Sequence, residues 1–374
     1  GDDVRAAVKE IGFPVLIRPS YVLGGRGMEI LANQKQLDAY LAEAYLAPDK
    51  PLLVDEYLGH AIELDVDAAT DGEDVLIGAV MEHLEEAGIH SGDSTCFIPT
   101  QNISEEMLAR VRDQTKRIGL GLKIKGCFNI QFAIQGDNLY CLEVNPRSSR
   151  TVPFVAKATG VPMARIAARV TLGIPLSAQD IPVPTSGHVA VKAPVFPFIK
   201  LQGLDPAPGP EMKSTGEVYG SDTRADVAYL KARLATEIPV ATEGGAYLTV
   251  RDEDKQSLIP VAEELQSMGF VLYATPGTAD VLRDSGIEVQ TVYRIAERMH
   301  PDALDLMRTG KVSFIVNVPT ISGGAVRDGN MMRRLAVEMN IPFVTTMSGA
   351  VMEVAAIRAC REVDLQPMRL EVNY

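Results

Sequence analysis

From about residue 243 onward, short apolar segments alternate with segments of helical spacing. The apolar segments are AYLTV, FVLYAT, EVQTVY, SFIVNV and PFVTTM, which begin at residues 246, 270, 288, 313 and 342. Strands that alternate with helices favour a parallel sheet, because each connection must cross over the sheet and does so as a helix. The pattern therefore predicts a doubly wound parallel-sheet domain over residues 241–374.

The first part of the chain has a different pattern. Strand-like segments are joined by short turns, such as DGED at 71–74. Ser104 is a good N-cap for a long amphipathic helix. We therefore expect an α+β unit of mostly antiparallel strands over residues 1–175, which makes the chain as a whole α/β. Residues 176–240 are rich in proline and glycine, and we expect them to be an ordered crossing segment packed on that unit.

The composition excludes several classes of protein. With 374 residues, 46% hydrophobic and 23% charged, the chain is long enough for two or three ordinary globular domains. A net charge of −13 argues against a nucleic-acid or anionic-membrane partner. No apolar run has transmembrane length and no signal peptide opens the chain, so we expect a cytoplasmic protein.

The cysteines agree with a reducing compartment. They are Cys96, Cys127, Cys141 and Cys360, and none forms a C-x-x-C pair. Cys127 and Cys141 lie in apolar strand-like segments, and we expect both to be reduced core residues. The five histidines show no metal-ligand spacing.

The segment CFNIQFAIQGDNLYCLEVN predicts a β-hairpin with polar side chains on one face. Side chains alternate along a strand, so Asn129 and Gln131 share a face, as do Glu143 and Asn145. A three-residue turn at 136–138 would pair Gln131 with Glu143 and Asn129 with Asn145, whereas a two-residue turn would put these sets out of register. We expect the three-residue turn, with an oxygen-rich face in front of an apolar core.

The polar face of this hairpin has the chemistry of a metal and phosphate site. Gln131, Glu143 and Asn145 offer only oxygen ligands, which suit Mg²⁺. Arg147 and Arg150 follow at once and could hold phosphate or carboxylate. The alternative is a solvated hairpin face with two surface arginines, because polar alternation is common in half-exposed sheets.

Two glycine-containing loops are ambiguous on their own. GGRG at 24–27 lies between Arg18 and a second strand, and Arg26 lies within it. It is neither a Walker A motif nor a G-x-G-x-x-G turn, and an ordinary hairpin turn is the alternative to a phosphate-binding loop. AGIHSGDS at 87–94 would by itself be a surface loop.

Three long segments together resemble one family. RPSYVLGGRGMEI, MEHLEEAGIHSGDS and EVNPRSSRTVPFVAKATGVPMARIAARV occur in the order found in the large subunit of carbamoyl phosphate synthetase. They resemble its second ATP-grasp unit, which phosphorylates carbamate. The biotin-carboxylase branch is a more distant resemblance. GPEMKSTGEVYG resembles the segment that follows this unit, and residues 241–374 resemble the methylglyoxal-synthase-like regulatory domain.

The resemblance implies a reaction and its site. The reaction is the phosphorylation of carbamate to carbamoyl phosphate for pyrimidine and arginine synthesis, with ATP and with Mg²⁺ or Mn²⁺. The implied ATP-binding residues are Arg18, Arg26, Glu56, Leu58, Glu63, Gly88, Ile89, His90, Ser91, Gln131 and Glu143. Of these, Arg18 and Arg26 would reach the phosphates, Glu56 and Leu58 the adenine, and Glu63 the ribose. The implied metal ligands are Gln131, Glu143 and Asn145. Catalytic roles fall to Asn145 and to Arg147 and Arg150, which would clamp carbamate and the transferred phosphate.

The resemblance also implies an effector site in the last domain. The implied residues are Lys255, Thr275, Thr278, Arg294 and Asn317, with Thr275 and Thr278 in an ATPGT segment that follows a strand and opens a helix. Arg294 stands where a lysine is usual, and the sequence departs from the family after Asn317, so the small-molecule effector stays open. A helix cap without a ligand is the alternative. Methylglyoxal synthase activity is not expected.

Parts of the family's large subunit have no counterpart in this sequence. We expect a C-terminal fragment or one piece of a split subunit, which works with the remaining N-terminal part of the large subunit and with a glutaminase small subunit that supplies ammonia. Two hypotheses follow. The chain carries the carbamate-phosphorylating site of an enzyme that needs the missing portion, or it is a catalytically incomplete remnant that acts mainly as an effector-binding regulatory module.

Overall fold

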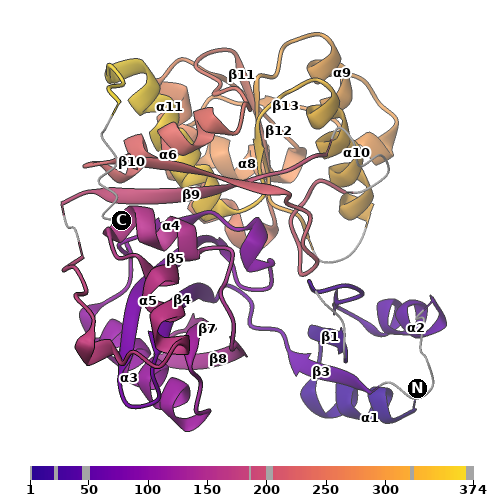
Figure 1. The fold of residues 1–374 in the computed structure, drawn as a ribbon. Coiled ribbons are helices and arrows are strands. Elements are labelled where there is room, and N and C mark those ends of the chain that lie inside the picture. The colour runs from indigo at the N-terminus through magenta and orange to yellow at the C-terminus, as the bar shows by residue number, and fades with distance from the viewer. Residues whose placement is uncertain are drawn as a thin grey trace.

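The chain folds around three β-sheets, one antiparallel lobe at the N-terminus, one large antiparallel sheet and one parallel sheet (Figure 1). The structure is a computed structural model, and it describes residues 2–20, 24–43, 51–184, 187–198, 205–320 and 324–367. Figure 1 shows the N-terminal lobe to one side of the rest of the molecule, with the chain passing from one to the other at the end of β3.

The N-terminal lobe is a small three-stranded sheet covered by two helices. The strands have the order β2-β1-β3, and both pairs are antiparallel. A compact apolar core of Val8, Val15, Ile17, Leu31 and Leu37 holds the helices on the sheet. The elements are α1 (Asp2–Ile11), β1 (Val15–Pro19), β2 (Glu29–Leu31), α2 (Gln34–Glu43) and β3 (Leu52–Glu56).

The large sheet has seven strands in the order β10-β9-β6-β5-β4-β7-β8, and every pair is antiparallel. The antiparallel character predicted for the first unit is confirmed. Two of its strands lie in the stretch 176–240, which was expected as an ordered crossing segment packed on that unit. The strands are β4 (Ile62–Thr70), β5 (Val75–Glu86), β6 (Cys96–Ile98), β7 (Gly126–Gln135), β8 (Asn138–Asn145), β9 (Val189–Val195) and β10 (Gly216–Asp222).

The two faces of this sheet differ in chemistry. Even-numbered residues of β4 and β7, such as Val66 and Ile130, pack against α3 (Glu105–Gly121). Ser104 caps α3, since its hydroxyl accepts from the Met107 amide at 3.2 Å, as predicted. On the other face, α4 (Val152–Thr159) and α5 (Met163–Thr171) cover only one end. The uncovered end of that face carries the polar side chains of β4 and β7.

The β7–β8 hairpin reaches the predicted pairing by a different route. The turn has two residues, because Gln135 pairs with Asn138, so the predicted three-residue turn is wrong. A β-bulge then places Phe132 opposite Cys141 and Gln131 opposite Glu143, with Leu142 as the extra residue. The bulge shifts the register by one residue and restores the polar pairing that the shorter turn would have destroyed.

Cys141 does not lie in the core. It is exposed on the edge strand β8 beside the bulge, whereas Cys127 is buried as predicted. The apolar run around Cys141 was misleading because an edge strand next to a bulge has only one covered face.

The C-terminal sheet has five strands in the order β13-β12-β11-β14-β15, and all pairs are parallel, as predicted. Its strands are β11 (Gly245–Thr249), β12 (Val271–Ala274), β13 (Gln290–Thr291), β14 (Phe314–Asn317) and β15 (Phe343–Val344). Its helices are α7 (Lys255–Ser267), α8 (Pro276–Asp284), α9 (Ala303–Arg308), α10 (Gly324–Glu338) and α11 (Met347–Glu362). Separate apolar clusters on its two faces show that helices cover both.

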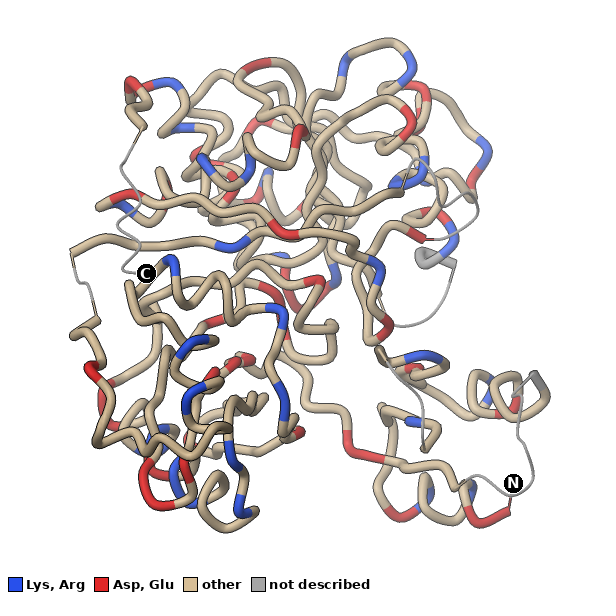
Figure 2. The backbone as a smooth tube through the Cα atoms, viewed as in Figure 1, with Lys and Arg blue, Asp and Glu red and all other residues tan. Residues whose placement is uncertain are grey.

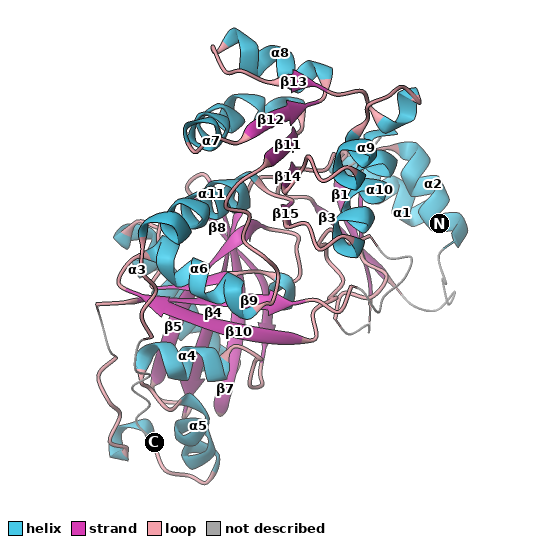
Figure 3. Ribbon diagram, turned by 90° about the horizontal axis from the view of Figure 1, so that it is seen from above, coloured by secondary structure: helices cyan, strands magenta, loops and turns pink. Residues whose placement is uncertain are grey.

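Helices α6 (Ala225–Ala235) and α11 join the large sheet to the parallel sheet (Figure 3). Val227 and Leu230 of α6 share one apolar cluster with Val191 of β9 and with Ala356 and Ala359 of α11.

Lysines and arginines are interspersed with acidic residues along the whole tube in Figure 2. Within the described ranges, no helix combines the length and apolarity that a membrane crossing needs.

Candidate functional site

The polar face of the large sheet is a set of two side-chain rows that cross three strands. In the first row, Asp65 of β4 pairs with Gln131 of β7, which pairs with Glu143 of β8. In the second row, Asp67, Asn129 and Asn145 follow each other in the same way. The structure thus brings together the three predicted metal ligands, with Asn145 Nδ2 donating to Glu143 Oε1 at 2.7 Å.

The inner part of this site was not predicted. Asp65 and Asp67 are buried, and Asn129 Nδ2 donates to Asp65 at 3.2 Å and to Asp67 at 3.0 Å. His83 Nε2 lies 3.2 Å from Asp65, and the side chain of Lys192 on β9 is also buried nearby. The sequence did contain a signal for them. Every second residue at the start of IELDVDAAT is acidic, so these acids share one face of a strand, as the polar residues of the hairpin do.

The buried acids differ in their affinity for protons. Burial raises the pKa of Glu63 to about 7, although the His83 charge opposes the shift. Burial also raises the pKa of Asp67 to about 6. Burial has the same effect on Asp65, but the hydrogen bond and charge of His83 outweigh it and hold the pKa of that carboxyl below its ordinary value. The group nearest His83 therefore carries its negative charge most firmly.

Replacing Glu63 with glutamine should make the free energy of unfolding less dependent on pH. The pKa of Glu63 is about 7 in the folded chain and near its ordinary value of 4.5 in the unfolded chain. This carboxyl therefore stabilises the fold below its unfolded pKa, and that contribution is lost as the pH rises to about 7. In urea unfolding, the free energy of unfolding should fall less between about pH 5 and about pH 8 for Glu63→Gln than for the unaltered chain. Glu106→Gln, at an exposed helix position, is the control, and an equal fall in both variants would contradict the prediction.

The loop 88–91 lies against the first row of the sheet. Gln131 Nε2 donates to Ser91 Oγ at 2.6 Å, which links a predicted metal ligand to a predicted nucleotide contact. The His90 amide donates to the Gly209 carbonyl at 2.8 Å, and His90 Nδ1 accepts from the Gly92 amide at 3.0 Å. Burial lowers the pKa of His90. The imidazole is therefore held neutral and oriented by its own loop.

The predicted phosphate-side residues lie in the N-terminal lobe. Arg18 Nε pairs with Asp55 Oδ2 at 2.7 Å, and Arg26 is exposed in the glycine loop. The Gly24 carbonyl accepts from the Met212 amide at 3.1 Å, and a Cβ on Gly25 would lie 1.9 Å from the Pro210 carbonyl oxygen. Only glycine allows this approach, so the loop packs tightly on the segment after β9.

The predicted adenine-side residues lie at the end of β3. Glu56 is the last residue of that strand, and Leu58 packs with Ala61, Ala87 and Ala133 at the start of the large sheet. A pocket of about 320 Å³ lies beside them between the N-terminal lobe, the large sheet and the parallel-sheet domain. It is lined by the predicted residues Gly88 and Ile89 and by Met28, Ile30, Tyr57 and Arg251.

The two predicted substrate arginines lie in the connection from β8 to α4. Arg147 donates to the Ser148 carbonyl at 3.1 Å and lies 3.4 Å from Asn145 Oδ1. Arg150 donates to Met212 Sδ at 2.9 Å, and its Nε lies 3.6 Å from Glu217. Both side chains are exposed, and among the described residues neither is hydrogen-bonded to a carboxylate. Neither guanidinium is held by a hydrogen-bonded carboxylate, so each can still bind an anion.

The five predicted effector residues line one pocket of about 350 Å³ at the carboxyl ends of the parallel strands. Thr278 and Asn317 are almost fully buried there, and Lys255 Nζ pairs with Asp252 at 2.6 Å. Thr275 precedes α8 but its side chain makes no capping hydrogen bond, which disfavours the helix-cap alternative. The basic side chains and the start of α8 suit an anionic ligand.

Comparison with known proteins gives the family. Residues 1–179 match the model of the carbamoyl-phosphate synthase L chain, ATP binding domain, and residues 257–345 match the MGS-like domain. The carbamoyl phosphate synthase large chain of Methanosarcina barkeri is 48% identical over 358 residues, covering 95% of this chain and 89% of that protein. The chain belongs to the carbamoyl phosphate synthase large-chain family.

Other large chains are longer than this chain. The chain is 46% identical to the Methanoculleus marisnigri large chain over 370 residues, which is 98% of this chain but 35% of that protein. It is 45% identical over 383 residues to a protein of Methanocaldococcus jannaschii named carbamoyl phosphate synthase large chain, C-terminal section, of which it covers 62%. The chain therefore spans only a part of the length of these two relatives.

Solved structures support the fold of the first unit. The biotin carboxylase domain of the Hydrogenobacter thermophilus 2-oxoglutarate carboxylase, in complex with MgADP and bicarbonate, aligns with a TM-score of 0.50 and 19% identity over 63% of this chain and 59% of that chain. An Aspergillus clavatus carboxyaminoimidazole ribonucleotide synthase complexed with ATP aligns with the same TM-score and 14% identity over 63% of this chain and 65% of that chain. At these identities the likeness concerns the ATP-grasp fold alone.

The large-chain family implies a metal, and the two rows fit one. Glu143 contributes a carboxylate and Gln131 and Asn145 contribute amide oxygens, a set of hard ligands from facing strands. The buried carboxylates of Asp65 and Asp67 lie beside them on β4 and accept from Asn129, so the Asn129 amide is held in a defined orientation. The arrangement is suited to a hard divalent cation such as Mg²⁺.

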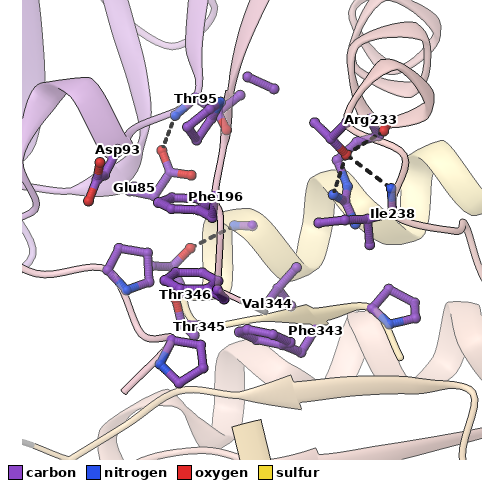
Figure 4. Close-up of a pocket in the computed structure, with 18 of the residues that line it drawn as sticks. Glu85, Asp93, Thr95, Phe196, Arg233, Ile238, Phe343, Val344, Thr345 and Thr346 are labelled. Atoms are coloured by element: carbon purple, nitrogen blue, oxygen red, sulfur yellow. Dashed lines mark hydrogen bonds between the residues drawn. The ribbon is translucent and has the colours of Figure 1, made fainter. Parts of the chain in front are cut away.

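A third cavity of about 190 Å³ lies between the ATP-grasp unit and the parallel-sheet domain (Figure 4). Figure 4 shows Glu85 and Thr95 on one side and Phe343 and Val344 of β15 on the other. The Thr95 amide donates to Glu85 at 2.6 Å, and burial raises the pKa of that carboxyl. No predicted nucleotide or effector residue lines this cavity.

Proposed function

We propose that the chain carries the carbamate-phosphorylating site of carbamoyl phosphate synthase. The observation that supports this most strongly is the position of Arg147 and Arg150, at the end of the hairpin that presents Gln131, Glu143 and Asn145. Two guanidinium groups beside an oxygen-ligand metal site can bind an anionic acceptor next to a triphosphate.

In this proposal the chain acts mainly by binding and alignment. A carbamate oxygen forms a bond to the γ-phosphorus of ATP while the bond from that phosphorus to the β,γ-bridging oxygen breaks, so that carbamoyl phosphate and ADP result. Arg147 and Arg150 hold the carbamate and the moving phosphoryl group, and Ser91 and His90 border the nucleotide. Mg²⁺ or Mn²⁺ bound at Glu143 would neutralise phosphate charge. No side chain has to form a covalent bond.

The proposal is tested by the reverse partial reaction, the formation of ATP from carbamoyl phosphate and MgADP, with the large chain that contains this section. Arg150→Lys keeps the charge but loses the two-pronged donor geometry, so we expect kcat/KM to fall about 100-fold. Arg117→Lys, at an exposed arginine of α3, is the matched control. No ATP formation by the unaltered chain would refute the proposed function, and a near-normal rate for Arg150→Lys would assign that arginine to the surface.

The proposed reaction sets further expectations. Carbamate arises from ammonia, so we propose that a glutaminase small subunit and the remaining N-terminal part of the large chain act together with this section. Carbamoyl phosphate would then serve pyrimidine and arginine synthesis. The described cysteines are all free thiols, which supports the cytoplasm as the compartment.

A second candidate function is regulation through the parallel-sheet domain, and two sets of contacts favour it. Asn317 in the effector pocket accepts from Arg333, whose guanidinium donates to both oxygens of Asp205 at 2.8 and 2.5 Å. The segment that begins at Asp205 continues to Lys213 and Ser214, whose amides both donate to Asp93 at 2.8 Å. Asp93 closes the loop that carries Ser91, so the effector pocket is connected to the nucleotide loop.

The second contact is more direct. Arg251 lines both the effector pocket and the 320 Å³ pocket beside Gly88. Its guanidinium pairs with Asp254 at 2.6 Å in the parallel-sheet domain and with Glu86 at 3.4 Å at the end of β5. A ligand that moves Arg251 would therefore act on the strand that leads into the nucleotide loop.

Calorimetric titration of the 374-residue chain with a nucleoside monophosphate and with inorganic phosphate tests effector binding. Thr278→Val keeps the side-chain shape but removes a buried hydroxyl from the pocket, and we expect affinity to fall about tenfold. Thr309→Val removes a hydroxyl that bonds only within its own helix and should not change affinity. Equal affinities for the two variants, or no heat with either ligand, would exclude an anion site at Thr278.

A further inference from the structure

The loop between β8 and α4 carries Arg147 and Arg150, and the contacts of these two side chains do not by themselves fix their orientation. Their described contacts are to a carbonyl, an amide oxygen, a methionine sulfur, the Ser214 hydroxyl at 3.5 Å and the Glu217 carboxylate at 3.6 Å, and both side chains are exposed. A long exposed side chain without a firm partner takes its direction from its backbone. The residues that fasten this backbone therefore decide where the arginines point.

Asp67 is the residue that fastens it. Ser149 Oγ lies 2.7 and 2.8 Å from the two oxygens of the Asp67 carboxylate, and Thr151 Oγ1 donates to it at 2.6 Å. Ser149 and Thr151 are the two neighbours of Arg150 in the sequence. Their side chains turn inward to Asp67, while that of Arg150 is exposed between them.

The same carboxylate is also bound to the metal-site rows. Asn129 Nδ2 donates to Asp67 at 3.0 Å, and Asn129 is the strand partner of Asn145. Asp67 thus connects the second row of the sheet with the arginine loop through one buried group that is 1% exposed. Movement of the loop relative to the rows would break at least one of these bonds.

The partners of Asp67 explain why an acid stands there. The Asn129 amide and the hydroxyls of Ser149 and Thr151 all donate, and a carboxylate can accept from all three. An asparagine would present an amide N–H group on one side. That group cannot accept, so it would face one of these donors without a hydrogen bond unless a hydroxyl reoriented to accept from it. Burial raises the pKa of Asp67 to about 6, with Thr151, Asn129 and Ser149 opposing the shift, so the group is mainly ionised at neutral pH.

We propose that Asp67 is a positioning residue, which holds the loop of Arg147 and Arg150 in register with the metal-site rows through Ser149, Thr151 and Asn129. It touches neither nucleotide nor carbamate and acts only through these contacts. This inference rests on the proposed function, because the orientation of the loop affects the reaction only if its arginines bind the reacting groups.

The test measures ATP formation from carbamoyl phosphate and MgADP with the large chain that contains this section. For Asp67→Asn we expect kcat to fall about 10- to 100-fold and KM for carbamoyl phosphate to rise, with KM for MgADP within about twofold of the unaltered value. Thr151→Val should show the same pattern to a smaller degree, and Thr151→Ser should restore the activity. Thr115→Val, which removes a buried hydroxyl within α3, is the matched control for loss of a buried hydrogen bond.

A double variant separates positioning from a general loss of stability. If Asp67 acts through Arg150, Asp67→Asn combined with Arg150→Lys should lower kcat little more than Arg150→Lys alone. Three outcomes would overturn the inference. The two substitutions could lower kcat independently, so that their effects multiply, or Asp67→Asn could raise both KM values equally. The third is an equal loss of activity in Thr151→Val and Thr115→Val. If Asp67→Asn does not fold, Thr151→Val and Thr151→Ser alone decide it. Normal activity of Asp67→Asn refutes only the positioning role, whereas an inactive unaltered chain refutes the proposed function and the inference with it.

Discussion

Replacement of Glu143 with glutamine should lower the rate of ATP formation from carbamoyl phosphate and MgADP by about a thousandfold. Glu143 is the one carboxylate among the three proposed metal ligands, and it lies between Gln131 on the facing strand and Asn145 on its own strand. Glutamine keeps the shape but loses the charge that attracts a divalent cation. The side chain is exposed, so the fold should not change.

The measurement compares steady-state rates over a range of Mg²⁺ and Mn²⁺ concentrations in the large chain that contains this section. The apparent metal affinity should fall together with kcat, and high metal concentrations should recover only part of the rate. Glu106→Gln, an exposed acid on α3, should behave like the unaltered chain. An unchanged rate with unchanged metal dependence would remove Glu143 from the metal site.

Replacement of Glu353 with alanine should lower the free energy of unfolding by about 3–5 kcal/mol. Glu353 of α11 is fully buried and accepts from Arg233 Nε at 2.8 Å and from the Tyr229 hydroxyl at 2.8 Å. Both partners belong to α6, so the contact joins the large sheet to the parallel-sheet domain. Alanine would leave the Arg233 guanidinium buried without its counter-charge, which is the costly state.

Chemical denaturation followed by circular dichroism measures this loss. The double variant Arg233→Met with Glu353→Met removes both charges, and we expect it to be more stable than Glu353→Ala, because no unpaired charge remains. Arg358→Met, which removes one partner of a half-exposed pair with Glu264, should cost less than about 1 kcal/mol. A loss below about 1 kcal/mol for Glu353→Ala would show that water reaches Arg233 at this interface.

Much of the architecture could be predicted from local pattern. The five parallel strands and the Ser104 cap follow from apolar spacing and turn chemistry within a few residues. The pairing of Gln131 with Glu143 was also predicted correctly, although the turn has two residues instead of the expected three. The bulge at Leu142 is a local departure from regular strand pairing, and the residue types around it do not predict its position.

The candidate site was predicted only in part, and the omissions have a common cause. Asp65 and Asp67 lie more than 60 residues from Asn129 in the sequence, and their roles become visible only when β4 pairs with β7. Lys192 lies on β9, in the proline-rich stretch that was expected as an ordered crossing segment. Sequence periodicity shows which residues share a face of a strand, but not which strands lie side by side.

The sequence by itself determined the elements and the chemistry that each presents. Period-two polar alternation sets the oxygen-rich face, strand–helix alternation sets the parallel sheet, and the motifs place the chain in its family. Only the tertiary structure decided which of these faces meet, because the order of strands depends on burial of apolar surface over the whole chain. For that reason the link from Asn317 through Arg333 to Asp205, and the link from Asp67 to the arginine loop, are absent from any local pattern. Both depend on segments that lie far apart in the sequence and are brought into contact by the packing of the sheets.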